Sequence, residues 1–160
     1  MRLNESRNGM KLSTKGRYGM VALADLALLN TNELAPLSDI SRRQDISLPY
    51  LEQLFVKLRR KNLVESVRGP NGGYRLARAA SEIRVVDILN ALDETVDALH
   101  MGAGASGGIS GSKAQSMSNR LWEVMSAQVY VFLHQTRLSD VVENTLSPCP
   151  AVPNLFEVTD

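Results

Sequence analysis

Residues 47–61 have the sequence Ser47-Leu-Pro-Tyr-Leu-Glu-Gln-Leu-Phe-Val-Lys-Leu-Arg-Arg-Lys61. Apolar side chains recur in it at the spacing of a helix that packs one face on a core, at Leu51, Leu54, Phe55 and Leu58. Ser47 is a suitable N-cap, and Pro49 falls in the first turn, where its missing N–H would have had no intrahelical partner. The pattern therefore predicts an amphipathic helix that begins after Ser47.

The face of this helix opposite the apolar stripe is polar and carries Glu52, Gln53, Lys57 and Arg60. Carboxylate and amide groups can hydrogen-bond to the edges of bases, whereas Lys and Arg bind phosphate or guanine. The combination predicts a helix that recognises DNA. For Glu52 the alternative is a surface residue paired with Lys57, but a spacing of five residues is poor for such a pair.

Two short strand-like segments, residues 63–67 and 74–76, follow this helix and flank Arg68-Gly-Pro-Asn-Gly-Gly73. The Pro-Asn-Gly-Gly run supplies the positive-φ residues that a tight hairpin needs. A helix followed directly by a hairpin is the order of elements in a winged helix. We therefore predict a mainly α fold with a small β wing.

Three further helices are expected in the same domain. Ser13 or Thr14 caps the first, which runs to about Asn30, and the second covers Leu37–Gln44. Asp45 tolerates the left-handed conformation, so residues 44–47 form the turn of a helix-turn-helix. A fourth helix, residues 85–92, closes the core.

These elements divide the chain into four parts. Residues 10–92 form a winged helix-turn-helix DNA-binding domain, 93–119 a Gly- and Ser-rich loop of the kind that carries a sensor, and 120–145 a region around a C-terminal dimerisation helix. Residues 1–9 and 146–160 are expected to be flexible ends.

Charge is distributed unevenly between the two halves of the chain. Residues 1–78 hold 14 Lys and Arg against 7 Asp and Glu, and residues 79–160 hold 4 against 10. The half with the predicted recognition helix is thus strongly basic, which favours a polyanionic partner such as double-stranded DNA. Charge alone does not establish this, because exposed lysines and arginines are common on proteins of every class.

The last long helix is predicted from Leu121 to about Gln135, with a stripe that includes Leu121, Met125, Val129 and Phe132. An apolar-faced helix beyond a complete small core needs a partner surface, so we expect it to form a homodimer. The alternative is that this helix folds back on its own domain.

Signals of other function classes are weak. Gly102-x-Gly104-x-x-Gly107 matches a dinucleotide-binding string but follows a helix-like segment and opens no βαβ unit. The two histidines show no metal-ligand spacing, and the carboxylates form no evident acid/base pair, so the sequence does not favour an enzyme. The longest apolar run, residues 18–29, is too short to span a membrane, and the N-terminus lacks the apolar core of a secretory signal, which predicts a cytoplasmic protein.

Four segments together resemble the IscR-type family of bacterial winged-helix regulators of iron-sulfur cluster biogenesis, over about residues 10–145: residues 10–20, 46–55, 67–74 and 92–97. The resemblance implies a homodimer with a 2Fe-2S cluster bound by three cysteines and a histidine. It places Lys15, Arg17 and Tyr18 near the DNA backbone, Glu52 and Gln53 in the major groove, and Arg68 with its wing in the minor groove. Further DNA contacts are expected from Ser47, Tyr50, Lys57, Arg60, Gly69, Gly72 and Gly73.

The cluster ligands of this family are absent from the chain. The cysteine positions fall at about Met101, Ile109 and Ser116, and the histidine position at Asn119. These side chains cannot replace three thiolates and an imidazole in the usual geometry. Either the cluster has been lost, or it is bound through other ligands, of which Cys149 is the only thiolate and His100 a weaker candidate.

The sequence thus predicts a DNA-binding repressor or activator of iron-sulfur or iron-homeostasis genes. A cofactor-free winged-helix regulator is one alternative. A winged helix that binds an acidic protein is the other, and it would lack the salt dependence that counterion release gives to DNA binding.

Overall fold

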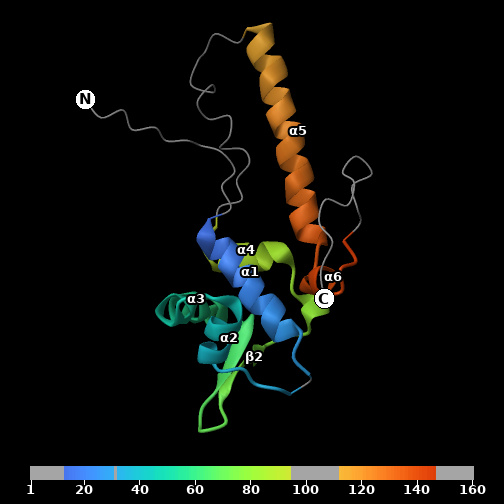
Figure 1. Cartoon of the computed structure of the whole chain (residues 1–160). Helices are drawn as coiled ribbons and strands as arrows, with labels where there is room; N and C mark the ends of the chain where they lie inside the picture. The colour runs from blue at the N-terminus through green and yellow to red at the C-terminus, as the bar shows by residue number, and fades with distance from the viewer. Residues whose placement is uncertain (1–12, 31, 95–111, 147–160) are drawn as a thin grey trace, which may run out of the picture.

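The computed structural model describes residues 13–30, 32–94 and 112–146. In chain order its elements are α1 (Thr14–Ala27), α2 (Leu37–Gln44), α3 (Leu48–Arg60), β1 (Val64–Val67), β2 (Gly73–Leu76), the 3₁₀ helix η1 (Ala80–Glu82), α4 (Val85–Ala91), α5 (Lys113–Gln135) and α6 (Leu138–Val142). Helices α1 to α4 and the hairpin gather at one end of the molecule, and α5 rises from it (Figure 1). The predicted class, mainly α with a small β wing, is confirmed.

The helix-turn-helix forms as its capping residues predict. The Ser13 side chain accepts a hydrogen bond from the Lys15 N–H at the start of α1, and the Ser47 side chain accepts one from the Tyr50 N–H at the start of α3. Asp45 ends α2 in the left-handed region, with φ 52°. The predicted bounds of α2 and α3 are therefore confirmed.

Helix α1 is shorter than predicted, because it ends at Ala27 and not at about Asn30. The Leu29 N–H bonds to the Leu26 carbonyl oxygen, which tightens the last turn. Beyond it, Glu33 accepts hydrogen bonds from the Asn30 N–H and side-chain amide, so the polar residues stabilise a turn in place of another helical turn.

The wing is an antiparallel pair in which Val64 lies opposite Leu76 and Val67 opposite Gly73. Ala35 extends this sheet through two backbone hydrogen bonds with Tyr74, of 2.9 and 2.8 Å. A Cβ on Gly73 would lie 2.6 Å from the Ala35 carbonyl carbon, so this approach requires glycine. The prediction for the turn was partly wrong: the residue with positive φ is Gly69, at 123°, ahead of the Pro-Asn-Gly-Gly run.

One hydrophobic core joins the helices and the base of the wing. It contains Ala22, Leu23, Leu26, Ala35, Ile40, Ile46, Leu51, Leu54, Phe55, Leu58, Leu63, Val64, Ile83, Ile88, Ala91, Leu92 and Leu138. Phe55 of α3 and Tyr74 of β2 pack edge to face, with ring centroids 4.9 Å apart, and so couple the recognition helix to the wing.

Helix α6 was not predicted and belongs to this core. Leu138 is fully buried, and its N–H bonds to the Ile83 carbonyl oxygen at 2.8 Å. The Asp140 side chain accepts from the Arg137 N–H at 2.8 Å, which caps the helix. The region 120–145, expected to serve dimerisation, therefore also supplies part of the core formed by α1 to α4.

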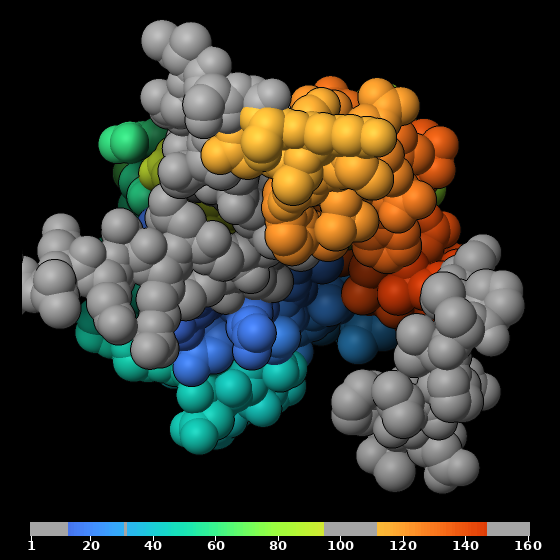
Figure 2. All heavy atoms as spheres, turned by 90° about the horizontal axis from the view of Figure 1, so that it is seen from above, coloured from blue at the N-terminus to red at the C-terminus, as the bar shows by residue number. Residues whose placement is uncertain are grey.

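Helix α5 begins at Lys113, so the prediction of a loop up to residue 119 and a helix from Leu121 was wrong for this segment. Ser112 and Gln115 form a reciprocal cap, because each side chain bonds the other residue's N–H. Helix α5 projects away from the bundle of α1 to α4, and the lower end of α5 in Figure 1 contacts α4. Seen from above, its yellow-orange first turns stand nearest the viewer, apart from the teal atoms of the helix-turn-helix (Figure 2).

Candidate nucleic-acid interface

The outward face of α3 presents the polar side chains that the sequence singled out. Glu52, Gln53 and Arg60 are exposed, while Lys57 lies half-buried on the flank of the helix nearer α4. The opposite face is buried, so α3 is fixed on the core and its polar face is free to enter a groove. An α-helix fits the major groove of B-DNA, where amides and carboxylates meet base edges.

Val56 is a residue of this face that the sequence analysis missed. Its side chain is 40% exposed, and on the helix it lies between Glu52 and Arg60. A β-branched residue in an exposed helical position is a poorer helix former than Ala, Glu or Lys, so local helix stability does not explain it. An apolar group on a reading face is complementary to the C5-methyl group of thymine. An apolar residue outside the apolar stripe of the helix was the sequence signal that could have identified Val56.

Two tyrosines join the start of α1 to the start of α3. Tyr18 and Tyr50 pack edge to face, with ring centroids 5.7 Å apart and planes at 83°. Burial raises the pKa of Tyr50 above its ordinary value, and neighbouring Tyr18 and Glu94 add to the effect. A tyrosine hydroxyl in this position can donate a hydrogen bond to a phosphate. A hollow of about 430 Å³ lies beside them, lined also by Thr14, Asp45, Ile46 and Ser47.

The first turns of α1 carry the basic residues that the resemblance placed on the DNA backbone. Arg17 is exposed, and Lys15 is half-buried. Glu94, which the sequence analysis did not assign to this site, is itself buried and accepts hydrogen bonds from the Ser13 hydroxyl and from the Gly16 N–H, the latter at 3.0 Å. Its carboxylate satisfies the Gly16 N–H, one of the free N–H groups of the helix terminus, and holds the capping Ser13, so it fixes the turn that presents Lys15 and Arg17.

The tip of the wing lies at the far end of the hairpin (Figure 1), where Arg68 is exposed and no ion pair is found for it among the described residues. Gly69 supplies the positive φ after it. At Gly72 a Cβ would lie 2.2 Å from the Val67 carbonyl oxygen, so the return strand requires glycine there. Gly69, Gly72 and Gly73 thus shape the wing, and the arginine provides its charge.

The turn that follows α4 brings a further acidic residue, Asp93, against α3. The Asp93 carboxylate accepts a hydrogen bond from the Lys57 ammonium, with Nζ and Oδ2 2.7 Å apart. Lys57, which the sequence predicts to contact DNA, therefore already forms an ion pair with another residue of the same chain.

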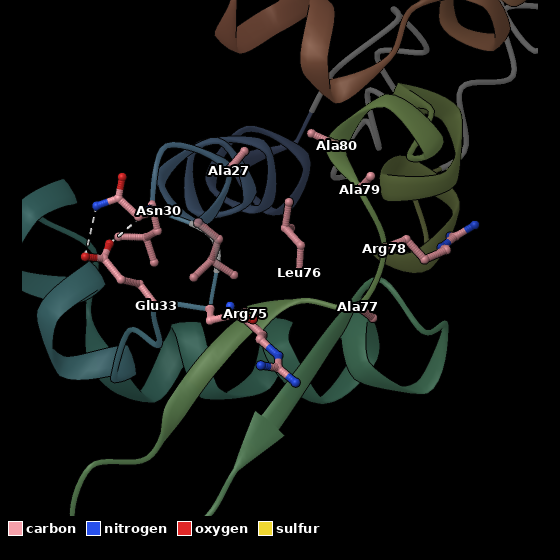
Figure 3. A pocket seen from close by; sticks show the side chains of 12 residues that line it. Ala27, Asn30, Glu33, Arg75, Leu76, Ala77, Arg78, Ala79 and Ala80 are labelled. Atoms are coloured by element: carbon pink, nitrogen blue, oxygen red, sulfur yellow. Dashed lines mark hydrogen bonds between the residues drawn. The ribbon is translucent and has the colours of Figure 1, made fainter.

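A second hollow lies away from this face, between the end of α1 and β2, with a volume of about 470 Å³. Figure 3 shows Leu76 and Ala27 among the side chains that line it, while Arg75 extends across the hairpin and pairs with Glu65 of the opposite strand. Glu33 at its rim is bonded to Asn30. Arg75 and Glu33 are engaged in this way, and Arg78 points away from the other lining residues in Figure 3, so the hollow offers no convergent set of polar groups for a ligand.

The residues that the structure describes do not fit an iron-sulfur cluster. Ser116 and Asn119, at two of the expected ligand positions, lie in the first turns of α5, and neither is a cluster ligand of the usual kind. Within the described ranges no three His, Cys, Asp or Glu side chains come together as a metal site. Met101, Ile109, His100 and Cys149 lie outside the described residues, as does the Gly102–Gly107 string.

The predicted dimerisation stripe lies on two faces of α5. Leu121 and Phe132 are 59% and 55% exposed, whereas Met125 and Val129 are half-buried. A second line of side chains, which we call the α5 seam, recurs in alternating steps of four and three residues: Met117, Leu121, Val124, Gln128 and Val131. The apolar members of the seam are 45% to 65% exposed. Such steps are typical of helices that pair with another helix.

No helix in the described ranges is both long and apolar enough to cross a membrane.

Residues 12–144 match the model of the Rrf2 family, which is described as an iron-dependent transcriptional regulator. The HTH-type transcriptional regulator IscR of Cereibacter sphaeroides is 70% identical over 153 residues, which cover 94% of this chain and 99% of that protein. The IscR of Vibrio atlanticus is 45% identical, over 84% of this chain and 76% of its own.

Two solved structures share the fold. CymR, the global cysteine regulator of B. subtilis, superposes with a TM-score of 0.71 at 30% identity and covers 84% of this chain and 97% of its own. The IscR of T. potens gives a TM-score of 0.67 at 36% identity, over 86% and 89%. The resemblance drawn from the four sequence segments is thereby confirmed, and the chain belongs to the Rrf2 family as an IscR-type, DNA-binding transcriptional regulator and not an enzyme.

Proposed function

We propose that this protein is a homodimeric operator-binding regulator of iron-sulfur or iron-homeostasis genes that reads DNA with α3. The observation that carries the proposal is the arrangement around α3. Its exposed polar face, with Glu52 and Gln53, is flanked by the basic start of α1 on one side and by the wing on the other. A regulator that works on chromosomal DNA acts in the cytoplasm.

In this proposal each part of the surface has a separate task. Glu52 and Gln53 hydrogen-bond to base edges in the major groove, and Ser47, Tyr50 and Arg60 hold the neighbouring backbone. Lys15, Arg17 and Tyr18 contact phosphates beside the start of α1. Arg68, carried on the glycine-shaped wing, enters the minor groove, where a narrow groove attracts an arginine.

The α5 seam supports the homodimer. A single helix that exposes Met117, Leu121 and Val124 along one line has an apolar surface to bury, and a second copy offers the same surface. Two-fold pairing along α5 would set two recognition helices about one DNA turn apart and so demand a palindromic operator.

The iron-sulfur part of the proposal rests on the resemblance. Three of the four family ligands would be thiolates, and this chain has one cysteine. Because the described residues do not fit a cluster, the DNA contacts proposed here are made by protein side chains alone.

The test is selection of binding sites from random duplexes, followed by titration of the selected operator and an unrelated duplex at several salt concentrations. A palindromic consensus, with affinity that falls steeply as salt rises, is the expected result. Binding to an acidic protein, with no preference among duplexes and no salt dependence towards DNA, would instead support the protein-interaction alternative.

A further inference from the structure

The end of α4 aims two neighbouring carboxylates at two different elements. The Glu94 N–H bonds to the Leu89 carbonyl oxygen at 3.0 Å, and Asp93 adopts the left-handed conformation with φ 56°. This is the hydrogen-bonding pattern of a Schellman helix end. It turns Glu94 towards the start of α1 and Asp93 towards α3, so both carboxylates reach helices of the proposed DNA interface.

Asp93 lies among basic groups of those two helices. Lys57 of α3 donates a hydrogen bond to it at 2.7 Å. That hydrogen bond and the charge of Lys57 hold the pKa of Asp93 below its ordinary value, and the charges of Lys15 and Lys61 act in the same direction. The Asp93 carboxylate therefore occupies a position in which a DNA phosphate could bind the same ammonium groups.

The pair is also placed for exchange. The Asp93 side chain is 71% exposed and that of Lys57 37% exposed, so solvent screens their attraction. Exposed ion pairs of this kind are weak, so a competing anion can displace the carboxylate. A phosphate that takes Lys57 would in turn be repelled by a carboxylate left a few ångströms away.

We propose that Asp93 is an internal competitor of DNA, which occupies the phosphate position of Lys57 and lowers the affinity of the free protein for any duplex. The inference rests on the proposed DNA-binding function and deepens it. DNA can use Lys57 fully only when the Asp93 contact opens. Since Asp93 belongs to the end of α4, a change in that turn alters DNA affinity without touching a base-reading residue.

The opposite role would be that Asp93 holds Lys57 in position for DNA. The two roles predict opposite changes in DNA affinity when the Asp93 carboxylate is removed. Loss of the carboxylate strengthens DNA binding if Asp93 competes, and weakens it if Asp93 positions the lysine.

The experiment compares wild type, Asp93→Asn, Lys57→Gln and the double variant in the full-length chain. Asn tolerates the left-handed conformation, so the helix end is preserved. Glu143→Gln is the control, because it removes one exposed negative charge from α6, which lies far from α3 in Figure 1. Binding to the selected operator and to an unrelated duplex is titrated by fluorescence anisotropy over a range of salt concentrations.

Asp93→Asn is expected to bind both duplexes about two- to fivefold more tightly than wild type, the range that an exposed ion pair allows. The logarithmic salt slope should steepen by up to about 0.9, the value for one further phosphate contact. In the Lys57→Gln background the gain should fall to that of Glu143→Gln.

Equal or weaker binding by Asp93→Asn would overturn the proposal, as would a gain that survives unchanged in the Lys57→Gln background. Failure of wild type and of Glu143→Gln to bind any duplex would instead refute the proposed function itself, and with it this inference. Thermal unfolding of each variant separates a lost fold from a lost contact.

Discussion

The buried carboxylate of Asp25 in α1 receives two hydrogen bonds from the guanidinium of Arg43 in α2, Nε to Oδ1 at 3.1 Å and a terminal nitrogen to Oδ2 at 2.6 Å. Gln44 donates a third, at 2.8 Å. This network ties the first helix to the helix-turn-helix, so the position of α3 relative to α1 depends on it. A two-bond Arg–carboxylate contact fixes orientation as well as distance.

Asp25→Asn is expected to lower the free energy of unfolding by about 2 kcal/mol, because the change leaves the Arg43 guanidinium without its charged partner. Urea denaturation followed by circular dichroism measures it. The matched control is Asp39→Asn, which removes the carboxylate of an exposed pair with Arg42 and should cost less than about 1 kcal/mol. Equal losses in the two variants would contradict the importance of the buried network.

The same network predicts a pH dependence. Burial acts to raise the pKa of Asp25, but hydrogen bonds from Arg43 and Gln44 and the charge of Arg43 outweigh it, so the pKa lies below its ordinary value. A lowered pKa stabilises the fold above the unfolded value of about 3.9 and ceases to do so as the pH falls through the folded value. The difference between wild type and Asp25→Asn should therefore be full at neutral pH and shrink in acid. A difference that stays constant down to acid pH would speak against this assignment.

Gln53→Ala should relax base preference at one position in each half-site and weaken operator binding by about 1 to 3 kcal/mol, as loss of a two-bond adenine contact does. Arg68→Ala should weaken binding at the wing without changing the preference that Gln53 sets in the major groove. Repeating the binding-site selection with each variant separates the two effects. If Glu52→Ala and Gln53→Ala bind a panel of operators and unrelated duplexes as wild type does, α3 is not the reading helix.

Val56 is expected to contact a thymine methyl group. Replacing one thymine per half-site by deoxyuridine, which lacks only that methyl, should weaken wild-type binding by roughly 1 kcal/mol, the value of a buried CH₂-sized group. Val56→Ala should bind the two duplexes equally. Scanning every thymine of the selected operator in this way locates the contact, and an operator without a sensitive thymine would leave Val56 with no part in recognition.

Val124→Asp should convert the proposed dimer to a monomer, because it places an unpaired charge in the centre of the α5 seam. Sedimentation equilibrium at micromolar concentration measures the change. Glu123→Gln is the control, since Glu123 is exposed and its neighbouring position points away from the seam. A wild-type protein that sediments as a monomer would remove both the dimer and the palindromic operator that it implies.

Cys149→Ser tests the prediction that this cysteine is a cluster ligand. If the protein carries a cluster, wild type reconstituted without oxygen should contain iron and sulfide and absorb in the visible range, and the variant should lose the iron, the sulfide and the absorbance, because one thiolate is all that the chain offers. A cluster retained by the variant would exclude Cys149 as a ligand. Absence of cluster from both proteins would make this a cofactor-free regulator.

The helix-turn-helix could be predicted from sequence because its signals are local. Ser47, Pro49 and the apolar spacing after them fix one helix within its own residues, and Asp45 marks the turn before it. The positions of Glu52 and Gln53 on the outer face follow from the same periodicity. Short-range chemistry was sufficient for the centre of the candidate site.

The parts that escaped prediction depend on contacts distant in sequence. Nothing near Glu94 indicates that it caps α1, because the Gly16 N–H that it accepts from lies 78 residues earlier in the chain. The pairing of Lys57 with Asp93 likewise arises only when α4 packs on α3. The start of α5 was predicted too late for a different reason. Its first turns are polar and follow a glycine-rich segment, so the cap formed by Ser112 and Gln115 was not recognised.

The burial of Leu138 has a consequence for the order in which the protein is made. Backbone hydrogen bonds join residues 83–85, which precede α5 in the chain, to residues 136–138, which follow it. The DNA-binding domain therefore lacks the Leu138 side chain of its core until the chain has been synthesised past α5. A nascent chain that has exposed only the helix-turn-helix and wing is therefore an unfinished domain. Native affinity for DNA must await emergence of α6 from the ribosome, which delays regulation until the helix proposed to form the dimer has also been made.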